Sequence, residues 1–260
     1  MKKTWRMIDT GVGAAASNMA ADEALLGLQG EDAMPVLRLY GWEPSISLGR
    51  FQDTAHIRRE VLEEHGVSCV RRMTGGGALV HGGDLSYSLV FPRSYLAGAG
   101  VKESYRNLCQ FLIRLYEKLG LEAWFTADAG MEACASSVCL AANEPYDIVI
   151  GGRKMGGNAQ RYTKHTLLMH GSIPMRFDRE RFSPLFGCDS GLDRAACLES
   201  LRVPILYEEL AALMVDSFSQ TFGAHMETDV LSDVESERTA ELVDRKYADE
   251  EWTWHGKPQA

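Results

Sequence analysis

The sequence predicts a mixed α+β fold. Segments of alternating apolar and polar residues, typical of strands, interleave with amphipathic helical segments, but without the regular strand–helix–strand spacing of a doubly wound sheet. No linker or internal repeat divides the 260 residues, and an apolar content of 45% suits a large buried core. We therefore expect residues 1–260 to form a single domain, with a helical annex over about residues 200–260.

Helices and strands are expected to alternate through the first half of the chain. Residues 16–28 place apolar side chains at helical spacing, and residues 104–119 do so most clearly, with Gly120 in the usual position after a helix. Turn residues such as Gly41 and Pro44 separate the alternating segments that indicate strands. The expected elements are a helix over 16–28, strands over 36–40 and 46–48, a helix over 58–65, strands over 67–71 and 85–91, and a helix over 104–119.

Beyond residue 120 the chain is expected to contain one long loop, a hairpin and several helices. Residues 126–142 are rich in Ala, Ser and Cys and show no clean periodicity, which indicates a loop. Gly151 and Gly152 indicate a tight turn between a strand and the segment that returns from Met155. The remaining expected elements are strands over 147–150 and 166–173 and helices over 178–186, 195–201, 206–222 and 236–247.

Charge and cysteine content exclude several classes of protein. A formal net charge of −9 and a pI of about 5.3 argue against nucleic acid as a partner, because binding phosphates requires clustered positive charge. No apolar stretch is long enough to cross a membrane and no secretory signal is recognisable, so we expect a cytoplasmic protein without a membrane partner. The six cysteines lack zinc-site spacing and are expected to be reduced thiols, most of them buried.

The most informative segment is a run of glycines that follows a predicted strand. Its three consecutive members are Gly75, Gly76 and Gly77. A bare triple glycine is more often a flexible hairpin tip, and this one lacks the residues of a nucleotide-binding loop. The flanking polar residues Arg71, Thr74 and His81 favour instead a ligand site in which backbone N–H groups line a pocket.

Two further segments contain side chains suited to acyl chemistry. Lys154 follows the predicted turn, from which its ammonium could bind a carbonyl oxygen or a thiolate, although a turn lysine is more often solvated. Cys139 lies in the predicted loop, and a loop thiol near a cation becomes a nucleophile, whereas the default for a cysteine is a buried structural thiol. Spacing alone does not show that Lys154 is that cation.

Other polar residues are weaker candidates for a role in the site. Asn158 and Gln160 could orient a substrate or hydrogen-bond to nearby backbone. His170 could serve as an acid or base, although a strand histidine is usually structural. Asp22 and Glu23, in the first predicted helix, are expected to face solvent or to act as helix N-terminal charges.

Several short segments form a recognisable pattern when they are taken in order. They are Thr4–Asp9, Asn18–Ala24, Tyr40–Pro44, Phe51–Gln52, Arg71–His81, Ser136–Cys139, Gly152–Gln160, His170–Ser172 and Lys246–Trp252. Together they resemble the biotin/lipoate protein ligase catalytic-domain superfamily, and within it the octanoyltransferases of the LipM type. The likeness runs nearly from end to end of the chain.

The resemblance implies a mixed α/β catalytic domain that moves an octanoyl group from acyl carrier protein to a lysine of a lipoyl domain, such as the glycine-cleavage H protein. It implies that Cys139 forms a thioester with the acyl group and that Lys154 lowers the pKa of this cysteine. No metal or nucleotide cofactor is implied. The residues that it places in the substrate site are Arg71, Thr74, Gly75, Gly76, Gly77, His81, Gly157, Asn158, Ala159, Gln160 and His170.

Alternative functions remain open. A lipoate–protein ligase, which activates free lipoate with ATP, shares most of these segments and the triple-glycine loop, but it needs no cysteine at position 139 and generally uses an accessory domain or partner subunit. A second transferase branch has its cysteine downstream of the His-Gly pair, which makes Cys188 a weaker candidate nucleophile. A non-catalytic protein that holds a lipoyl domain or a free acid is the third alternative, and the presence of both Cys139 and Lys154 argues against it.

Overall fold

The computed structural model describes residues 3–96, 98–131, 145–187 and 190–256. At its centre lies a six-stranded mixed sheet with the order β10-β11-β6-β2-β1-β13. These strands are β1 (Thr4–Gly13), β2 (Val36–Trp42), β6 (Asp84–Pro92), β10 (Gly157–Tyr162), β11 (Thr166–Pro174) and β13 (His225–Asp229). Neighbours from β10 to β2 pair antiparallel, whereas β1 pairs parallel with both β2 and β13. The predicted α+β class is confirmed.

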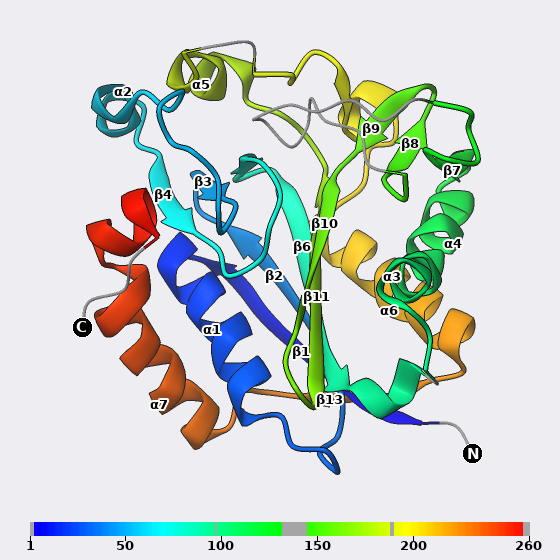
Figure 1. Cartoon of the computed structure of the whole chain (residues 1–260). Coiled ribbons are helices and arrows are strands. Elements are labelled where there is room, and N and C mark those ends of the chain that lie inside the picture. The colour runs from blue at the N-terminus through cyan, green and yellow to red at the C-terminus, as the bar shows by residue number, and fades with distance from the viewer. Residues whose placement is uncertain (1–2, 97, 132–144, 188–189, 257–260) are drawn as a thin grey trace.

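Two smaller sheets lie beyond one end of the central sheet, one on each side of it (Figure 1). The three-stranded sheet has the order β4-β3-β5 and consists of β3 (Ser45–Leu48), β4 (Ser68–Arg71) and β5 (Leu79–His81). The four-stranded sheet has the order β12-β9-β8-β7 and consists of β7 (Ala123–Phe125), β8 (Ile148–Ile150), β9 (Arg153–Met155) and β12 (Ala195–Ala196).

Helices cover both faces of the central sheet. In Figure 1, α1 (Ala15–Leu28) and α7 (Asp233–Leu242) lie on one side, and α3 (Val101–Leu108), α4 (Gln110–Lys118) and α6 (Tyr207–Phe222) lie on the other. The shorter elements are α2 (Arg59–Glu64), α5 (Arg179–Phe182), 3-10 helices at Arg93–Leu96, Ser183–Leu185 and Glu199–Leu201, and π-helical turns at Val243–Tyr247 and Glu251–His255. Within the described ranges, no helix is both long and apolar enough to span a membrane.

The alternation within β6 explains why one face of the sheet can hold a polar site. Leu85, Tyr87 and Leu89 point into the main hydrophobic core beneath α4 and α6. The residues between them, such as Ser86 and Ser88, face the α1 side. All nine residues of β6 are buried, so these serines are enclosed rather than solvated. A row of small polar side chains is thus available inside the protein.

Several sequence-based boundaries are corrected by the structure. The helix expected over 104–119 is two helices, α3 and α4, which meet at Cys109. Apolar side chains continue along one face through the break, so periodicity does not reveal it. The helix expected over 195–201 begins instead as strand β12 and ends as a 3-10 turn, because Ala195 pairs with Lys154 in β9.

The C-terminal annex is not purely helical. It contributes β13, which pairs with β1 at the edge of the central sheet, and the sequence analysis assigned neither strand. The residues of β13 are mostly exposed and polar, so they lack the apolar alternation by which strands are recognised. The strands expected over 36–40 and 46–48 both exist, but β2 belongs to the central sheet and β3 to the three-stranded sheet.

Candidate active site

A cavity of about 200 Å³, the glycine-loop cavity, lies where α1, the three-stranded sheet and the loop after β4 cover the central sheet. Its lining residues are Met19, Tyr40, Trp42, Ser47, Arg72, Gly75, Gly76, Leu79, His81, Ser86, Gly157, Asn158, Ala159, His170, Gly171 and Ser172. One transverse row of strand residues runs through this lining, because Gly157 pairs with Ser172, Ser172 with Ser86, and Ser86 with Tyr40. Three of the four are glycine or serine, which leaves a trench across the strands.

The glycine loop lies directly against the end of β3. A Cβ atom on Gly49 would lie 1.7 Å from the carbonyl oxygen of Gly76, so the two backbones could not approach as they do if Gly49 had a side chain. Gly76 has a φ of +96°, a conformation that favours glycine. The guanidinium of Arg72 donates to the carbonyls of Gly75 and Gly77, each at 2.8 Å, and so holds the loop in place.

Two buried aspartate–histidine pairs flank the cavity. In the first, His170 Nδ1 lies 2.9 Å from Asp22 Oδ2, and His170 Nε2 lies 2.7 Å from the hydroxyl of Thr74. Asp22 also accepts from Arg38 at 2.9 Å and from the Tyr40 hydroxyl at 3.2 Å. Burial would raise the pKa of Asp22, but the hydrogen bond from His170 and the charge of Arg38 outweigh it and lower the pKa. The ionised carboxylate thus fixes the histidine ring, which in turn holds Thr74 of the glycine loop.

The second pair has the same arrangement. His81 Nδ1 lies 2.9 Å from Asp84 Oδ2, and His81 Nε2 lies 2.8 Å from the hydroxyl of Ser47. Asp84 also accepts from the hydroxyls of Ser86 at 3.0 Å and Ser172 at 2.7 Å. Burial would raise the pKa of Asp84, but the charge of His81 and these hydrogen bonds lower it.

The sequence analysis misplaced Asp22 and did not single out Asp84. Asp22 is completely buried rather than solvent-facing. Glu23 is half-buried and is paired with Lys246 and Tyr247 near the C-terminus. The available signals were the adjacent charges Asp22 and Glu23 within a largely apolar, alanine-rich helix and the three-residue spacing of His81 and Asp84.

Lys154 is buried in an ion pair. Gly151 and Gly152, with φ of +56° and +72°, form the predicted turn between β8 and β9, which brings Lys154 back beside the start of β8. Its Nζ lies 2.6 Å from Oδ2 of Asp147, and both residues are 4% exposed. The interpretation of Lys154 as a solvated turn lysine is therefore wrong, and Asp147 is a partner that the sequence analysis missed.

Asn158 forms the end of β10 that borders the cavity. Its Oδ1 accepts from the hydroxyl of Tyr87 at 2.8 Å, and its carbonyl accepts from Tyr105 at 3.3 Å. A Cβ atom on Gly171 would lie 1.9 Å from this Oδ1, so Gly171 makes room for the amide. Gln160 lies farther along β10, where it contacts Met169 and Tyr162, and it is not in the cavity lining.

Arg71 is not brought to the cavity. Its guanidinium donates to the backbone carbonyls of Gly49 at 2.7 Å and Thr253 at 2.9 Å, and it thereby ties the C-terminal segment to the three-stranded sheet. The neighbouring Arg72 lines the cavity instead. Of the other expected substrate-binding residues, all line the cavity except Thr74 and Gly77, which support its loop, and Gln160.

The proposed nucleophile, Cys139, lies outside the described residues, as does Cys188. Among the cysteines that the structure does describe, burial raises the pKa of Cys69 to about 12 and that of Cys109 well above its ordinary value. Cys197 is also buried. Because a thiolate is the reactive form, Cys69 and Cys109 are poor candidates for a nucleophile.

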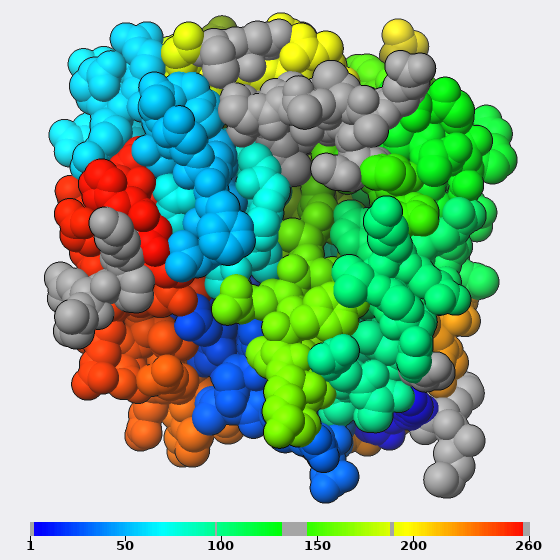
Figure 2. All heavy atoms as spheres, in the orientation of Figure 1, coloured from blue at the N-terminus to red at the C-terminus, as the bar shows by residue number. Residues whose placement is uncertain are grey.

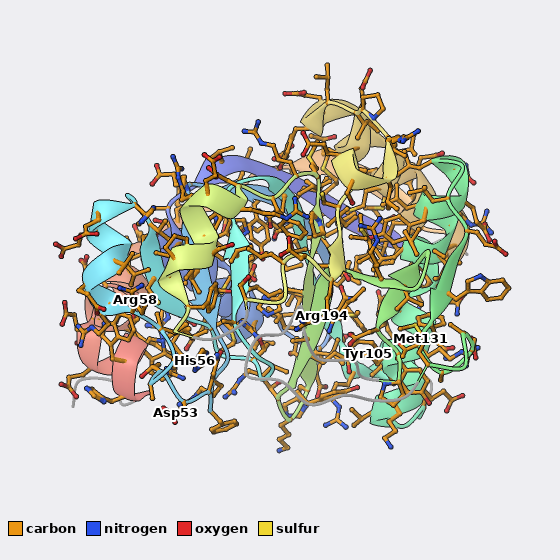
Figure 3. The ribbon with its side chains drawn as sticks, turned by 90° about the horizontal axis from the view of Figure 1, so that it is seen from above. Asp53, His56, Arg58, Tyr105, Met131 and Arg194 are labelled. Atoms are coloured by element: carbon orange, nitrogen blue, oxygen red, sulfur yellow. The ribbon has the colours of Figure 1, made fainter. Side chains whose placement is uncertain are left out.

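The cavity lies toward the end of the central sheet that the three-stranded sheet covers. In the space-filling view, the β10–β11 hairpin forms the middle of one face, between the segment after β3 and helix α3 (Figure 2). Seen from above, Arg194 lies between Tyr105 on one side and His56 on the other (Figure 3). Residues from three segments that are far apart in sequence are therefore seen side by side in this view.

Comparisons with known proteins agree with this geometry. Residues 14–227 match the family model of the lipoyl protein ligase A/B catalytic domain. Curated relatives include the LipM octanoyltransferases of Kyrpidia tusciae, 36% identical, and Bacillus subtilis, 32% identical, each covering 97% of this chain and 99% of the relative. The fold matches lipoate-protein ligase A bound with ATP at a TM-score of 0.83, with 25% identity over 98% of this chain and 99% of that one. It also matches the Thermoplasma acidophilum protein Ta0514 with bound lipoic acid at 0.82, with 25% identity over 98% and 100%.

The matches to the LipM enzymes extend over nearly the whole of both chains, and the triple-glycine loop, the start of β10 and the His-Gly pair line one cavity. The chain belongs to the lipoyl protein ligase A/B catalytic domain family and, within it, to the LipM octanoyltransferases.

Proposed function

We propose that this protein is an octanoyltransferase of lipoate biosynthesis that moves an octanoyl group from octanoyl-acyl carrier protein to a lysine of a lipoyl domain, such as the glycine-cleavage H protein. The observation that carries the proposal is a small cavity, lined by Met19, Leu79 and aromatic side chains, that ends at β10, three residues after the buried Lys154. Full-length membership of the LipM family supports the activity.

The reaction proceeds in two steps through Cys139. The Cys139 thiolate attacks the carbonyl carbon of the donor thioester, a new sulfur–carbon bond forms, and the carrier leaves as its thiol after taking up a proton. The amine of the acceptor lysine then attacks the acyl-Cys139 thioester, an amide bond forms, and the cysteine sulfur leaves. The amine gives up one proton in this second step. Splitting the transfer lets one acyl site serve two protein partners in turn.

Lys154 supplies positive charge to both steps. An ammonium beside the sulfur favours the thiolate, and the same charge stabilises the oxygen of each tetrahedral intermediate. The carboxylate of Asp147 accepts a hydrogen bond from Lys154 Nζ at 2.6 Å, which partners the buried amine and limits the directions in which it can point.

The glycine-loop cavity holds the acyl chain. Its volume of about 200 Å³ is small for a drug-sized ligand but suits a single unbranched chain. Met19, Leu79 and Tyr40 supply apolar contacts, while the glycine loop lets the backbone approach the chain closely. The supporting residues Thr74, His81 and His170 maintain the shape of the cavity through the two aspartate–histidine pairs.

A lipoate–protein ligase is the second candidate function, because lipoate-protein ligase A shares the fold. One set of incubations separates the two activities. The protein is mixed with an acceptor lipoyl domain and either octanoyl-acyl carrier protein or octanoate with ATP, and both proteins are weighed by mass spectrometry. We expect an octanoylated acceptor from the carrier thioester without ATP, together with a hydroxylamine-labile octanoyl adduct on Cys139.

Acceptor labelling that requires ATP and leaves Cys139 unmodified would instead establish the ligase. Binding of the lipoyl domain without transfer from either donor would indicate a non-catalytic protein. Matched variants sharpen the result: Cys139→Ala should abolish transfer, whereas Cys197→Ala should retain it, since Cys197 is a buried thiol outside the cavity lining.

A further inference from the structure

We propose that the stacked side chains of Trp42 and His81, the Trp42–His81 wall, close the far end of the glycine-loop cavity and set the longest acyl chain that the enzyme transfers. This inference rests on the proposed octanoyl transfer, because it assigns a direction to the chain within that cavity. It identifies a specificity-determining contact rather than a group that takes part in the chemistry.

The sheet register gives the cavity a direction. The transverse row begins at Gly157 in β10, passes through Ser172 and Ser86, and ends at Tyr40 in β2. Lys154 precedes Gly157 by three residues, so the reacting carbonyl belongs at the β10 end. The methyl end of the chain then points toward β2, where Tyr40 and Trp42 lie on the same face of the strand.

The length of the open trench matches an eight-carbon chain. Neighbouring strands are about 4.8 Å apart, so the row from Gly157 to Ser86 spans two spacings, or roughly 10 Å. Trp42 ends the trench there, because its indole Nε1 reaches across to donate to the Ser86 hydroxyl at 2.9 Å. An extended chain advances about 1.25 Å per carbon–carbon bond of about 1.5 Å, which gives roughly 9 Å for octanoyl and 14 Å for dodecanoyl.

Stacking and hydrogen bonds hold both side chains of the Trp42–His81 wall in place. The rings of Trp42 and His81 are stacked at a centroid distance of 4.0 Å and an interplanar angle of 15°. His81 is held at one ring nitrogen by Asp84 and at the other by Ser47. Both wall residues are almost completely buried. A longer chain could not displace the indole without breaking its hydrogen bond to Ser86 as well as the stacking.

Space lies beyond the wall. Trp42 also lines a second cavity of about 1050 Å³, whose apolar lining includes Leu198, Val203 and Ile205. His81 in turn also lines a further cavity of about 430 Å³. The wall therefore separates the acyl chain from a larger space rather than from solid core. Removing the indole should join the glycine-loop cavity to the second cavity and admit longer chains.

The test compares chain-length profiles of full-length variants. Octanoyl-, decanoyl- and dodecanoyl-acyl carrier protein are supplied with an acceptor lipoyl domain, and kcat/KM is measured for each. We expect Trp42→Ala to raise the dodecanoyl-to-octanoyl ratio at least about 10-fold over wild type, the scale on which one or two methylene contacts discriminate substrates. Trp42→Phe, which keeps an aromatic ring but shortens it, should give an intermediate ratio.

Trp5→Leu is the matched control, because Trp5 is as buried as Trp42 but lies outside the glycine-loop cavity. It should leave the ratio at the wild-type value even if it lowers stability. Circular dichroism confirms that each variant is folded. A Trp42→Ala profile identical to wild type, or an equal change in Trp5→Leu, would overturn the inference.

A binding measurement keeps this test separate from the proposed function. Calorimetric titration of wild type and Trp42→Phe with free octanoic and dodecanoic acid reports the length limit without any transfer. If wild type transfers no acyl group but Trp42→Phe gains affinity for dodecanoic acid, the transferase proposal fails while the proposed role of the Trp42–His81 wall is supported. If transfer proceeds normally and neither readout changes with the variant, the wall proposal fails alone.

Discussion

Replacing Asp22 by alanine removes a carboxylate that accepts hydrogen bonds from both β2 and β11. Its carboxylate receives hydrogen bonds from Arg38, Tyr40 and His170, and it is completely buried. Without Asp22, the Arg38 guanidinium remains inside the protein with less compensation, and His170 loses the partner that orients its ring toward Thr74. We expect losses of both stability and activity.

The expected loss of stability can be estimated from the buried ion pair of Asp22 with Arg38. Removing one partner of such a pair typically costs about 3–5 kcal/mol. Arg38 keeps bonds to Asn18 Oδ1 at 2.8 Å and to the Thr10 hydroxyl at 2.9 Å, which places the expected cost near the lower end, about 3 kcal/mol. For a chain of this size, 1 kcal/mol corresponds to about 2–4 °C, so Tm should fall by roughly 10 °C.

Thermal unfolding followed by circular dichroism measures this change. Asp216→Ala is the control, because its pair with Lys118 is exposed and its removal should leave Tm essentially unchanged. The double variant Asp22→Ala/Arg38→Met should recover part of the lost stability by removing the stranded charge. If Asp22→Ala melts within 2 °C of wild type, the buried network does not stabilise the site as we infer.

Three further predictions concern the site. Gly171→Ala should reduce transfer sharply while the protein stays folded, because its Cβ would lie 1.9 Å from Asn158 Oδ1; an unchanged kcat/KM would show that this close approach is unimportant. Lys154→Ala should slow octanoylation of the enzyme by about 100-fold, in line with the loss of one charge-stabilising group, and single-turnover mass spectrometry measures that rate. The pKa of Asp84 is lowered despite its burial, mainly by His81, so its stabilising contribution is present above the ordinary aspartate pKa of about 3.9 and is lost as pH falls through the folded-state value. The Tm difference between wild type and Asp84→Asn should therefore be largest near neutral pH and shrink below about pH 4; a constant difference would contradict this assignment.

Local patterns predicted the parts of the molecule that are formed by neighbours in sequence. Alternation identified β2 and β6, and the Gly151–Gly152 turn was identified from its glycines because no other residue adopts positive φ as readily. The triple glycine was predicted to line a ligand pocket, and Gly75 and Gly76 do line the cavity; the close approach of Gly76 to Gly49 was not predicted. These features depend on steric limits within a few residues.

The polar networks could not be predicted in the same way. Asp22 and His170 are 148 positions apart, and their pairing depends on how α1 packs against β11. In sequence Asp22 looks like an ordinary helix charge, and Arg71 looks as suitable for a ligand as Arg72 does. Only the register of β4 and the position of the C-terminal segment direct Arg71 to backbone carbonyls and Arg72 to the glycine loop.

The most direct test of the account is whether an acyl-Cys139 intermediate forms and is consumed at the rate of transfer. The protein is mixed with one equivalent of octanoyl-acyl carrier protein, acceptor lipoyl domain is added, and samples quenched in acid are analysed for octanoyl on the Cys139 peptide and on the acceptor lysine. We predict that the thioester appears first and decays as the acceptor is octanoylated, with matching rate constants. Transfer at the wild-type rate by Cys139→Ala, or acceptor labelling with no acyl group on Cys139 at any time, would contradict the account.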